Sequence, residues 1–325
     1  MRLPRTLALS VTVAGALAAL APVAAARVVH GKISARTAGF VGGSFDVGGG
    51  LRVQISASDS LPDPRGESQT WATFFKQLVH GSEIGRIRVR VMPVSEMGSY
   101  CGADADGCYD GNSELLVIPP TSYANGRLVA AHEYGHHLAN NRSNAPWDAL
   151  DWGTKRWATY ENVCARTRAG TAFPGNEDSE YGRDPGETFA EAYAVLNGFE
   201  WEGDTYSNTF KPDGRALALV RQDVLSPWRR SSVTRRSGTL ARSERSDRVA
   251  IPTPLDGTLR VTADGGTPLD IDLGLYSDAG RLLKRAATDA HRESVGYTVC
   301  GTRRVKAEVE RYRGAGTYAL TVSRP

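Results

Sequence analysis

The alternation of apolar and polar residues predicts a series of strands in the last third of the chain. Five segments alternate in this way, at residues 257–262, 269–276, 294–299, 304–310 and 317–322. Short turns rich in Gly, Asp and Ser separate them, which is typical of a small β-sandwich. We therefore expect an all-β domain at residues 229–325.

The first two thirds of the chain mix the two periods. Alternation at residues 51–55, 87–91 and 114–118 predicts strands, while helical spacing of apolar residues predicts helices at residues 67–78, 128–140, 147–166, 184–196 and 214–224. The four aromatic residues Trp147, Trp152, Trp157 and Tyr160 are interpreted as packing residues. Residues 27–50 are rich in Gly and show little periodicity, so we expect a loosely ordered lead-in.

Residues 1–26 have the features of a secretory signal peptide. Arg2 and Arg5 give a basic start, residues 7–20 are largely apolar, and small residues end at Ala26. The apolar run is shorter than the roughly twenty residues that a membrane-spanning helix needs. We expect cleavage near Ala26 and a secreted mature protein without a membrane span.

Charge argues against nucleic acid or an anionic membrane as the principal partner. Removal of residues 1–26 takes two of the 39 Lys and Arg and none of the 36 Asp and Glu, which leaves 37 against 36 and a net charge of +1. A chain that is 41% hydrophobic can form one domain of ordinary size and a smaller one. We assume a monomer.

Four cysteines in an exported protein fit two disulfides. Three connectivities are formally available. Cys101 and Cys108 enclose a turn-rich hexapeptide, which favours a local bridge and leaves Cys164 for Cys300. A Cys-ligated metal is not indicated, because no C-x-x-C spacing occurs.

His132, Glu133 and His136 form the pattern H-E-x-x-H. Positions i and i+4 of a helix share a face, so both imidazoles can bind one ion, and the Glu between them can take a proton from a water there. The ordinary alternative is two half-buried histidines beside a solvated Glu. The apolar residues around the motif indicate a buried helix and favour a catalytic zinc site.

A third zinc ligand must come from another segment. The extended pattern that adds a third His fails, because Arg142 stands at the last His position. Glu187 and Glu191 lie at i and i+4 on the apolar helix predicted at residues 184–196. One can bind zinc while the other accepts a hydrogen bond from a ligand imidazole. Glu161 is the rival ligand, but no acid follows it at i+4, and a charged outer helix face is the alternative for the pair.

H-E-x-x-H followed by a helix that carries Glu resembles the gluzincin group of zinc metallopeptidases. Residues 180–193, E-Y-G-R-D-P-G-E-T-F-A-E-A-Y, are similar to a segment of the anthrax lethal factor catalytic domain. This resemblance implies that Glu187 is the third zinc ligand, that Glu191 supports a ligand imidazole, and that Tyr181 helps to stabilise the oxyanion. This chain has one residue fewer between Tyr181 and Glu187, and the resemblance does not extend to the substrate-docking domains of lethal factor.

The resemblance also implies a fold, namely an α+β zinc metallopeptidase domain at residues 27–228, with a mixed sheet and active-site helices. The small all-β sandwich at residues 229–325 follows it. In that family the strand before the active-site helix runs along the sheet edge and holds extended substrate, and residues 114–118 correspond to it. An ordinary strand of the sheet is the alternative.

Two segments of the C-terminal region, residues 269–281 and 314–322, resemble the bacterial pre-peptidase C-terminal domain, which is found attached to secreted peptidases. Asp270 and Asp272 are candidate Ca²⁺ ligands, although acids that alternate along a strand are more often surface residues. Residues 229–248 hold seven Arg. They could attract an anionic cell surface or be a processing site, but a linker that merges into solvated first strands is favoured.

From these features we expect a secreted zinc-dependent endopeptidase that acts on a protein or peptide. Glu133 would be its general base and Tyr181 its oxyanion donor. The alternatives are a secreted binding or adhesion protein with a structural zinc, and a zinc hydrolase of a non-peptide amide. A structural site needs no base between the histidines and is closed by four ligands.

Overall fold

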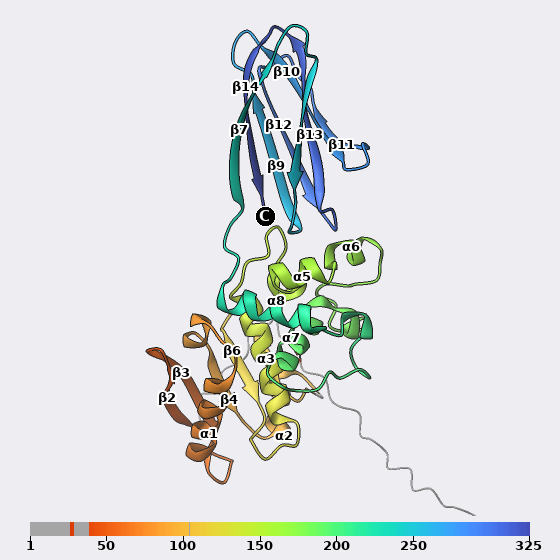
Figure 1. The fold of residues 1–325 in the computed structure, drawn as a ribbon. Helices are drawn as coiled ribbons and strands as arrows, with labels where there is room; N and C mark the ends of the chain where they lie inside the picture. The colour runs from red at the N-terminus through yellow and green to blue at the C-terminus, as the bar shows by residue number, and fades with distance from the viewer. Residues whose placement is uncertain (1–26, 29–38, 104) are drawn as a thin grey trace, which may run out of the picture.

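The computed structural model describes residues 27–28, 39–103 and 105–325 (Figure 1). The expected signal peptide, residues 1–26, lies outside the described residues. A mixed α/β region comes first along the chain, and an all-β region follows it and extends away from one of its ends (Figure 1). This order agrees with the expected α+β region followed by a β-sandwich. Within the described residues, no helix combines the length and the apolar character needed to cross a membrane.

The α/β region is built on a six-stranded sheet with the order β1-β5-β6-β4-β3-β2. The strands are β1 (Arg27–Val28), β2 (Phe40–Gly48), β3 (Leu51–Ser58), β4 (Arg88–Val91), β5 (Cys108–Asp110) and β6 (Leu115–Ile118). β3, β4 and β6 are parallel, whereas β2 is antiparallel to β3 and β5 is antiparallel to β6 and parallel to β1. The sheet is therefore mixed.

The expectation of a loosely ordered lead-in is wrong for residues 40–48, which form β2. This strand pairs with β3 across Gly48, Gly49 and Gly50, all of which have positive φ, a conformation that glycine adopts without strain. Gly42 is needed for close approach, because a Cβ there would lie 2.0 Å from the carbonyl oxygen of Ile55. These glycines interrupt the alternation that would predict a strand. In the structure they form the turn between β2 and β3 and allow the two strands to approach closely.

The expected position of the strand before the active-site helix is also wrong. β6 lies inside the sheet, between β4 and β5, and all four of its residues are buried. A strand that is apolar on both faces belongs in the interior of a sheet rather than at its edge. β5 takes the place nearer the edge. It begins at Cys108, which is bonded to Cys101, and β1 pairs with its other side.

Helices cover the sheet and carry the site. They are α1 (Pro64–Gln77), α2 (Val94–Cys101), α3 (Gly126–Asn140), α4 (Ala149–Trp152), α5 (Lys155–Tyr160), α6 (Val163–Arg168), α7 (Pro185–Leu196) and α8 (Gly214–Leu225). The single helix expected at residues 147–166 is thus three short ones. Trp157 there is fully buried, as expected of a packing residue, whereas Tyr160 is exposed. α3 is buried on almost every side because it lies against the sheet and against α7.

The all-β region is a sandwich of two four-stranded sheets, β11-β10-β13-β8 and β12-β9-β14-β7. The strands are β7 (Ser232–Leu240), β8 (Ser246–Pro252), β9 (Gly257–Asp264), β10 (Asp270–Ser277), β11 (Leu282–Ala286), β12 (Arg292–Val299), β13 (Arg304–Arg313) and β14 (Gly316–Arg324). Every second residue of β9, for example Leu259 and Val261, enters the core between the sheets. The five expected strands are present, and β7, β8 and β11 are additional.

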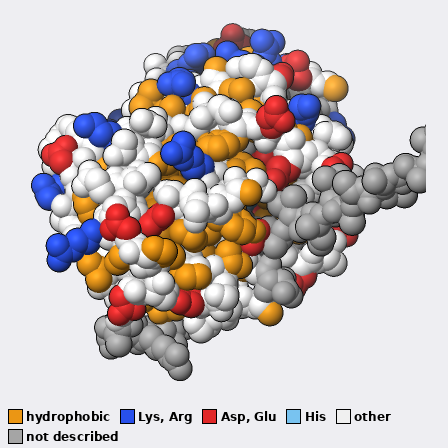
Figure 2. Space-filling view, turned by 90° about the horizontal axis from the view of Figure 1, so that it is seen from below, with side chains coloured by type: hydrophobic (Ala, Val, Ile, Leu, Met, Phe, Trp, Pro, Cys, Tyr) orange, Lys and Arg blue, Asp and Glu red, His pale blue; other side chains and the backbone are white. Residues whose placement is uncertain are grey.

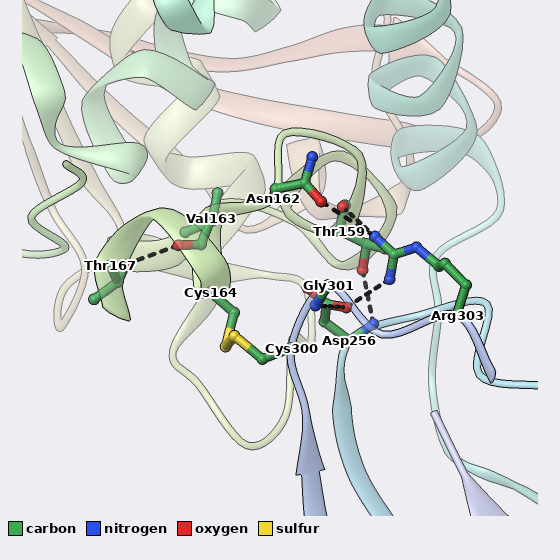
Figure 3. Close-up of a disulfide and its surroundings, with 9 residues drawn as sticks. All are labelled: Thr159, Asn162, Val163, Cys164, Thr167, Asp256, Cys300, Gly301 and Arg303. Atoms are coloured by element: carbon green, nitrogen blue, oxygen red, sulfur yellow. Dashed lines mark hydrogen bonds and ion pairs between the residues drawn. A yellow bond between two sulfur atoms is a disulfide. The ribbon is translucent and has the colours of Figure 1, made fainter. Parts of the chain in front are cut away.

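A disulfide and a group of hydrogen bonds join the sandwich to α5 and α6 (Figure 3). Cys164 on α6 is bonded to Cys300, so both expected disulfide pairings are present. Arg303 donates to Asp256 at 2.7 Å and to the carbonyl oxygen of Thr159 at 3.0 Å. The backbone N–H of Asp256 donates to the hydroxyl of Thr159 at 3.1 Å. One end of the sandwich is therefore fixed to the α/β region by covalent and polar contacts.

Figure 2 shows the end of the α/β region that lies away from the sandwich. Hydrophobic side chains gather in the middle of this face, and charged side chains of both signs lie around them. This end of the molecule therefore presents no field of a single sign.

Candidate metal centre

α3 brings His132 and His136 together on one face. Their Nε2 atoms are 3.1 Å apart, and the two side chains are only 2% and 0% exposed. Two ring nitrogens at this distance, one helical turn apart, face the same small volume.

α7 supplies the carboxylate of Glu187. The helix begins with Pro185 after Asp184, whose side chain accepts a hydrogen bond from the N–H of Gly186 at 2.8 Å. Glu187 therefore lies in the first turn. Its Oε2 is 3.1 Å from Nε2 of His132 and 3.4 Å from Nε2 of His136.

Gly135 explains why the two helices can approach closely enough. A Cβ on this residue would lie 2.7 Å from Cα of Ala190 on α7, closer than real side chains come. Only glycine therefore allows this crossing of α3 and α7. A residue between the two histidines thus sets the position of the third candidate ligand.

The three side chains fit a tetrahedral metal ion. Ligand atoms about 2.0–2.1 Å from zinc at tetrahedral angles lie roughly 3.3 Å from one another. The observed separations of 3.1 to 3.4 Å agree with this value. His132, His136 and Glu187 are also the group of potential metal ligands identified among the described residues. Such a set could hold a metal ion, with the carboxylate and imidazoles that zinc accepts.

Electrostatics also favour a bound cation. Burial by itself would lower the pKa of His132, but hydrogen bonds with Glu187 and Glu191 raise it to about 10. Burial would raise the pKa of Glu187, yet the neighbouring His136 and His132 hold it far below its usual range. Without an ion, this cluster therefore binds a proton tightly. A divalent cation would take the place of that proton.

Glu191 lies behind the cluster and contacts the ring of His132. Its Oε2 is 3.4 Å from Nδ1 of His132, and its Oε1 accepts a hydrogen bond from the backbone N–H of Glu202 at 3.1 Å. A carboxylate at Nδ1 would hold the ring with Nε2 directed at a bound metal ion. The two acids of α7 thus contact opposite nitrogens of one imidazole.

Glu133 is fully buried on the helix that carries both histidines. The loop before β5 packs against its side chain, because a Cβ on Gly107 would lie 3.5 Å from its Cγ and 2.5 Å from Val129. Glycine at position 107 therefore lets the disulfide-closed loop approach α3 beside the proposed base.

Tyr181 and Tyr206 place two hydroxyl groups beside the cluster. The hydroxyls are 3.1 Å apart, and the ring of Tyr206 stacks on that of His132 with centroids 5.9 Å apart. Burial and the negative charge of Glu187 raise the pKa of Tyr181 well above its ordinary value, so it stays a neutral donor. Tyr206 is only 3% exposed and its pKa is raised for the same reasons.

Glu161, the rival third ligand, and His137, which follows the second histidine of the motif, both lie outside the cluster. Glu161 is absent from the His132, His136 and Glu187 group, and Arg166 and Asp213 are its charged neighbours. His137 is buried, with its ring nitrogens 3.2 Å from the hydroxyl of Tyr109 and 3.0 Å from the carbonyl oxygen of Glu83. It is a hydrogen-bonded core residue.

Tyr206 is the site residue that the sequence pattern misses. It precedes a short turn, η3 (Asn208–Phe210), in a segment of irregular structure after α7. Its backbone neighbour Ser207 bonds to the carbonyl oxygen of Gly182 at 2.8 Å, which ties the loop to the turn η2 (Tyr181–Arg183). This long-range contact helps to bring the two tyrosines together, and no local sequence motif predicts it.

Comparison with known proteins gives no family. No protein-family model and no curated protein sequence matches the chain. Among solved structures, the pre-peptidase C-terminal domain of a collagenase from Bacillus anthracis is 14% identical, with 27% of this chain and 87% of that chain covered and a TM-score of 0.24.

Two further structures are similar to the same extent. The Yersinia pseudotuberculosis-derived mitogen is 14% identical, with coverages of 29% and 87% and a TM-score of 0.25. PliG, a periplasmic inhibitor of g-type lysozyme from Aeromonas hydrophila, is 11% identical, with coverages of 29% and 85% and a TM-score of 0.22. TM-scores of this size assign neither a family nor a function.

Proposed function

We propose that the protein is a secreted zinc-dependent endopeptidase. The observation that carries the proposal is the buried convergence of His132, His136 and Glu187, with Glu133 on the same helix as the histidines. Three protein ligands leave a coordination position for water, as catalytic zinc sites do, whereas structural sites use four. The resemblance of both motifs to gluzincins supports the same set of residues.

Each residue of the site has a role in this reaction. Zinc bound there would polarise a peptide carbonyl and lower the pKa of a water molecule. Glu133 takes the proton of that water and delivers it to the leaving amine. Tyr181 donates a hydrogen bond to the oxyanion, while Tyr206 orients the Tyr181 hydroxyl.

We propose that the substrate binds along the edge of the sheet. An extended peptide would pair with the main chain of β5, the strand that continues the sheet beyond β6. β1 pairs with that side of β5 and contacts α3, so a substrate would take its place. The β5 edge replaces residues 114–118 as the proposed peptide-binding strand.

Secretion and domain organisation belong to the same proposal. Two disulfides fit an oxidising compartment and therefore secretion, and we retain cleavage near Ala26 as part of the proposal. We assign residues 27–228 to the metallopeptidase domain and residues 229–325 to the sandwich domain. We further propose that the mature protein is a monomer.

Hydrolysis of casein and of a quenched peptide library by the purified mature chain tests the proposal. We expect cleavage that a zinc chelator stops and that added zinc restores. An active protein indifferent to the chelator, or a zinc-loaded protein that cleaves neither substrate, would contradict it. In the second case, an assay with small acyl-amide substrates separates a non-peptide hydrolase from a binding protein with structural zinc.

A further inference from the structure

The two regions of the chain carry opposite charge. Residues 27–228 contain 19 Lys and Arg against 25 Asp and Glu, a formal net charge of −6. Residues 229–325 contain 18 Lys and Arg against 11 Asp and Glu, a formal net charge of +7. The near-zero charge of the whole mature chain hides this asymmetry. A basic sandwich on an acidic partner region indicates that the sandwich has an anionic ligand of its own.

On the outer face of the β11-β10-β13-β8 sheet, Arg248 and Arg285 are paired with acids. Arg248 lies 3.0 Å from Glu308, and Arg285 lies 2.7 Å from Asp272 and 3.0 Å from Glu310. Such cross-strand pairs offset much of the positive charge of this face, where Arg304 is an exposed arginine outside these pairs.

The outer face of the other sheet, β12-β9-β14-β7, is different, and we call it the hydroxyl face. Residues such as Leu259 and Leu320 point into the core, so their sequence neighbours point outward. The strand register then places Ser294, Thr262, Thr321 and Arg235 side by side across all four strands. The hydroxyls of Thr262 and Ser294 are 3.0 Å apart. Three short hydroxyl side chains thus form the row, and the guanidinium of Arg235 lies at its end.

The adjacent row across the sheet also has short side chains and an arginine. Arg260 lies between Gly296 and Ser323, and both Arg260 and Arg235 are exposed. Among the described residues, neither guanidinium has a carboxylate within ion-pair distance, in contrast to Arg248 and Arg285 of the opposite sheet. Asp264 is the acid on this face, opposite Arg292 in the register, and its Oδ1 accepts from the N–H of Gly266.

We propose that the hydroxyl face binds an anionic polysaccharide, with its carboxylate or sulfate groups at Arg235 and Arg260 and its hydroxyls along the Ser and Thr rows. A flat array of short donors and acceptors suits an extended polymer that offers hydroxyl groups along its length. Guanidinium groups form strong, directional hydrogen bonds with carboxylate and sulfate. The opposite charges of the two regions orient the molecule with the sandwich toward the polymer.

The composition of this face disfavours the other polyanions. Val233 is its large exposed hydrophobic residue, so the face has no apolar side to insert among lipids. No Phe, Tyr or Trp points outward from these four described strands, whereas single-stranded nucleic acids are bound by stacking on aromatic rings.

Binding of the full mature chain to immobilised alginate, heparin and dextran tests the proposal at physiological ionic strength. Alginate carries carboxylates, heparin carries mainly sulfates, and dextran is neutral. We expect measurable affinity for alginate or heparin and none for dextran. The double variant Arg235→Gln/Arg260→Gln should lose about tenfold or more in affinity and keep wild-type peptide hydrolysis, so the result is independent of the proposed metal centre.

The matched control is Arg281→Gln/Lys284→Gln, which removes the same charge from exposed positions outside the hydroxyl face. Its affinity should stay within about threefold of the wild type. Equal losses in both variants would show that overall charge alone drives binding and would overturn the site. Absence of binding to both polyanions, or tighter binding to phosphatidylserine vesicles or to single-stranded DNA, would overturn the ligand class.

Discussion

Oε2 of Glu187 lies 3.1 Å from Nε2 of His132, although 55 positions separate the two residues. The contact depends on the close crossing of α3 and α7 at Gly135 and Ala190. It converts a two-histidine motif on one helix into a three-residue cluster with the size of a zinc site. The proposed chemistry and the predictions for the metal centre depend on this relationship.

Substitution Glu133→Gln should abolish peptide hydrolysis without loss of the metal. The amide keeps the shape of the side chain but cannot accept a proton, so kcat should fall by about 10³-fold, within the range for general acid–base groups. Steady-state kinetics on a quenched peptide, together with metal content, measure both effects. Wild-type turnover in this variant would exclude Glu133 as the base.

Substitution of Tyr181 and of Tyr206 by Phe should lower kcat by different amounts. Tyr181→Phe removes the proposed oxyanion donor and should lower kcat by about 10²-fold with little change in KM. Tyr206→Phe removes the hydroxyl 3.1 Å from that of Tyr181 and should cost about tenfold, because it acts through the position of Tyr181. A larger effect of Tyr206→Phe than of Tyr181→Phe would reverse the two roles.

Glu161 should destabilise the protein above neutral pH. Burial raises the pKa of Glu161 from 4.5 to about 7. The charge of Arg166 lowers this pKa, and the charge of Asp213 raises it. The folded state therefore binds more protons than the unfolded state between these values, and the free energy of unfolding falls as pH rises from about 4.5 to 7. Glu161→Gln should remove this dependence and raise the free energy of unfolding at pH 8 by about 2–3 kcal/mol.

Urea titrations at several pH values measure this effect. The variant should retain its metal, because Glu161 lies outside the cluster. Loss of the metal in Glu161→Gln would instead support this residue as a ligand.

A chain that begins at Gly39 should cleave peptides faster than one that begins at Arg27. The shorter chain lacks β1, which pairs with the side of β5 proposed for substrate. Its absence should raise kcat/KM, chiefly through a lower KM, whereas hydrolysis of a dipeptide too short to pair with β5 should change little. Equal kcat/KM for long peptides in both chains would show that β1 does not compete with substrate.

The sequence predicts the local parts of this site and misses those that depend on tertiary contacts. His132, Glu133 and His136 follow from one helix, and Glu187 and Glu191 from another, because each set is fixed by the helical period. Their mutual approach rests on Gly135, whose importance is visible only once α7 is placed.

The same distinction applies to the fold. Alternation predicts β9 and its neighbours, since one face of each strand enters the core. Alternation does not predict β2 or β7. β2 depends on glycines for its pairing with β3, and β7 is an edge strand that is exposed along almost its whole length. Tyr206 likewise has no local signal, since a loop contact with η2 brings it to the site.

Metal content of the purified chain tests the central claim most directly. Inductively coupled plasma mass spectrometry should find one zinc per chain in the wild type and in Glu133→Gln. It should find almost none in Glu187→Ala, and Glu191→Ala should bind zinc about 10- to 100-fold more weakly, as expected for a residue that supports a ligand. A wild-type protein without a transition metal, or full zinc occupancy in Glu187→Ala, would contradict the cluster of His132, His136 and Glu187 as the metal site.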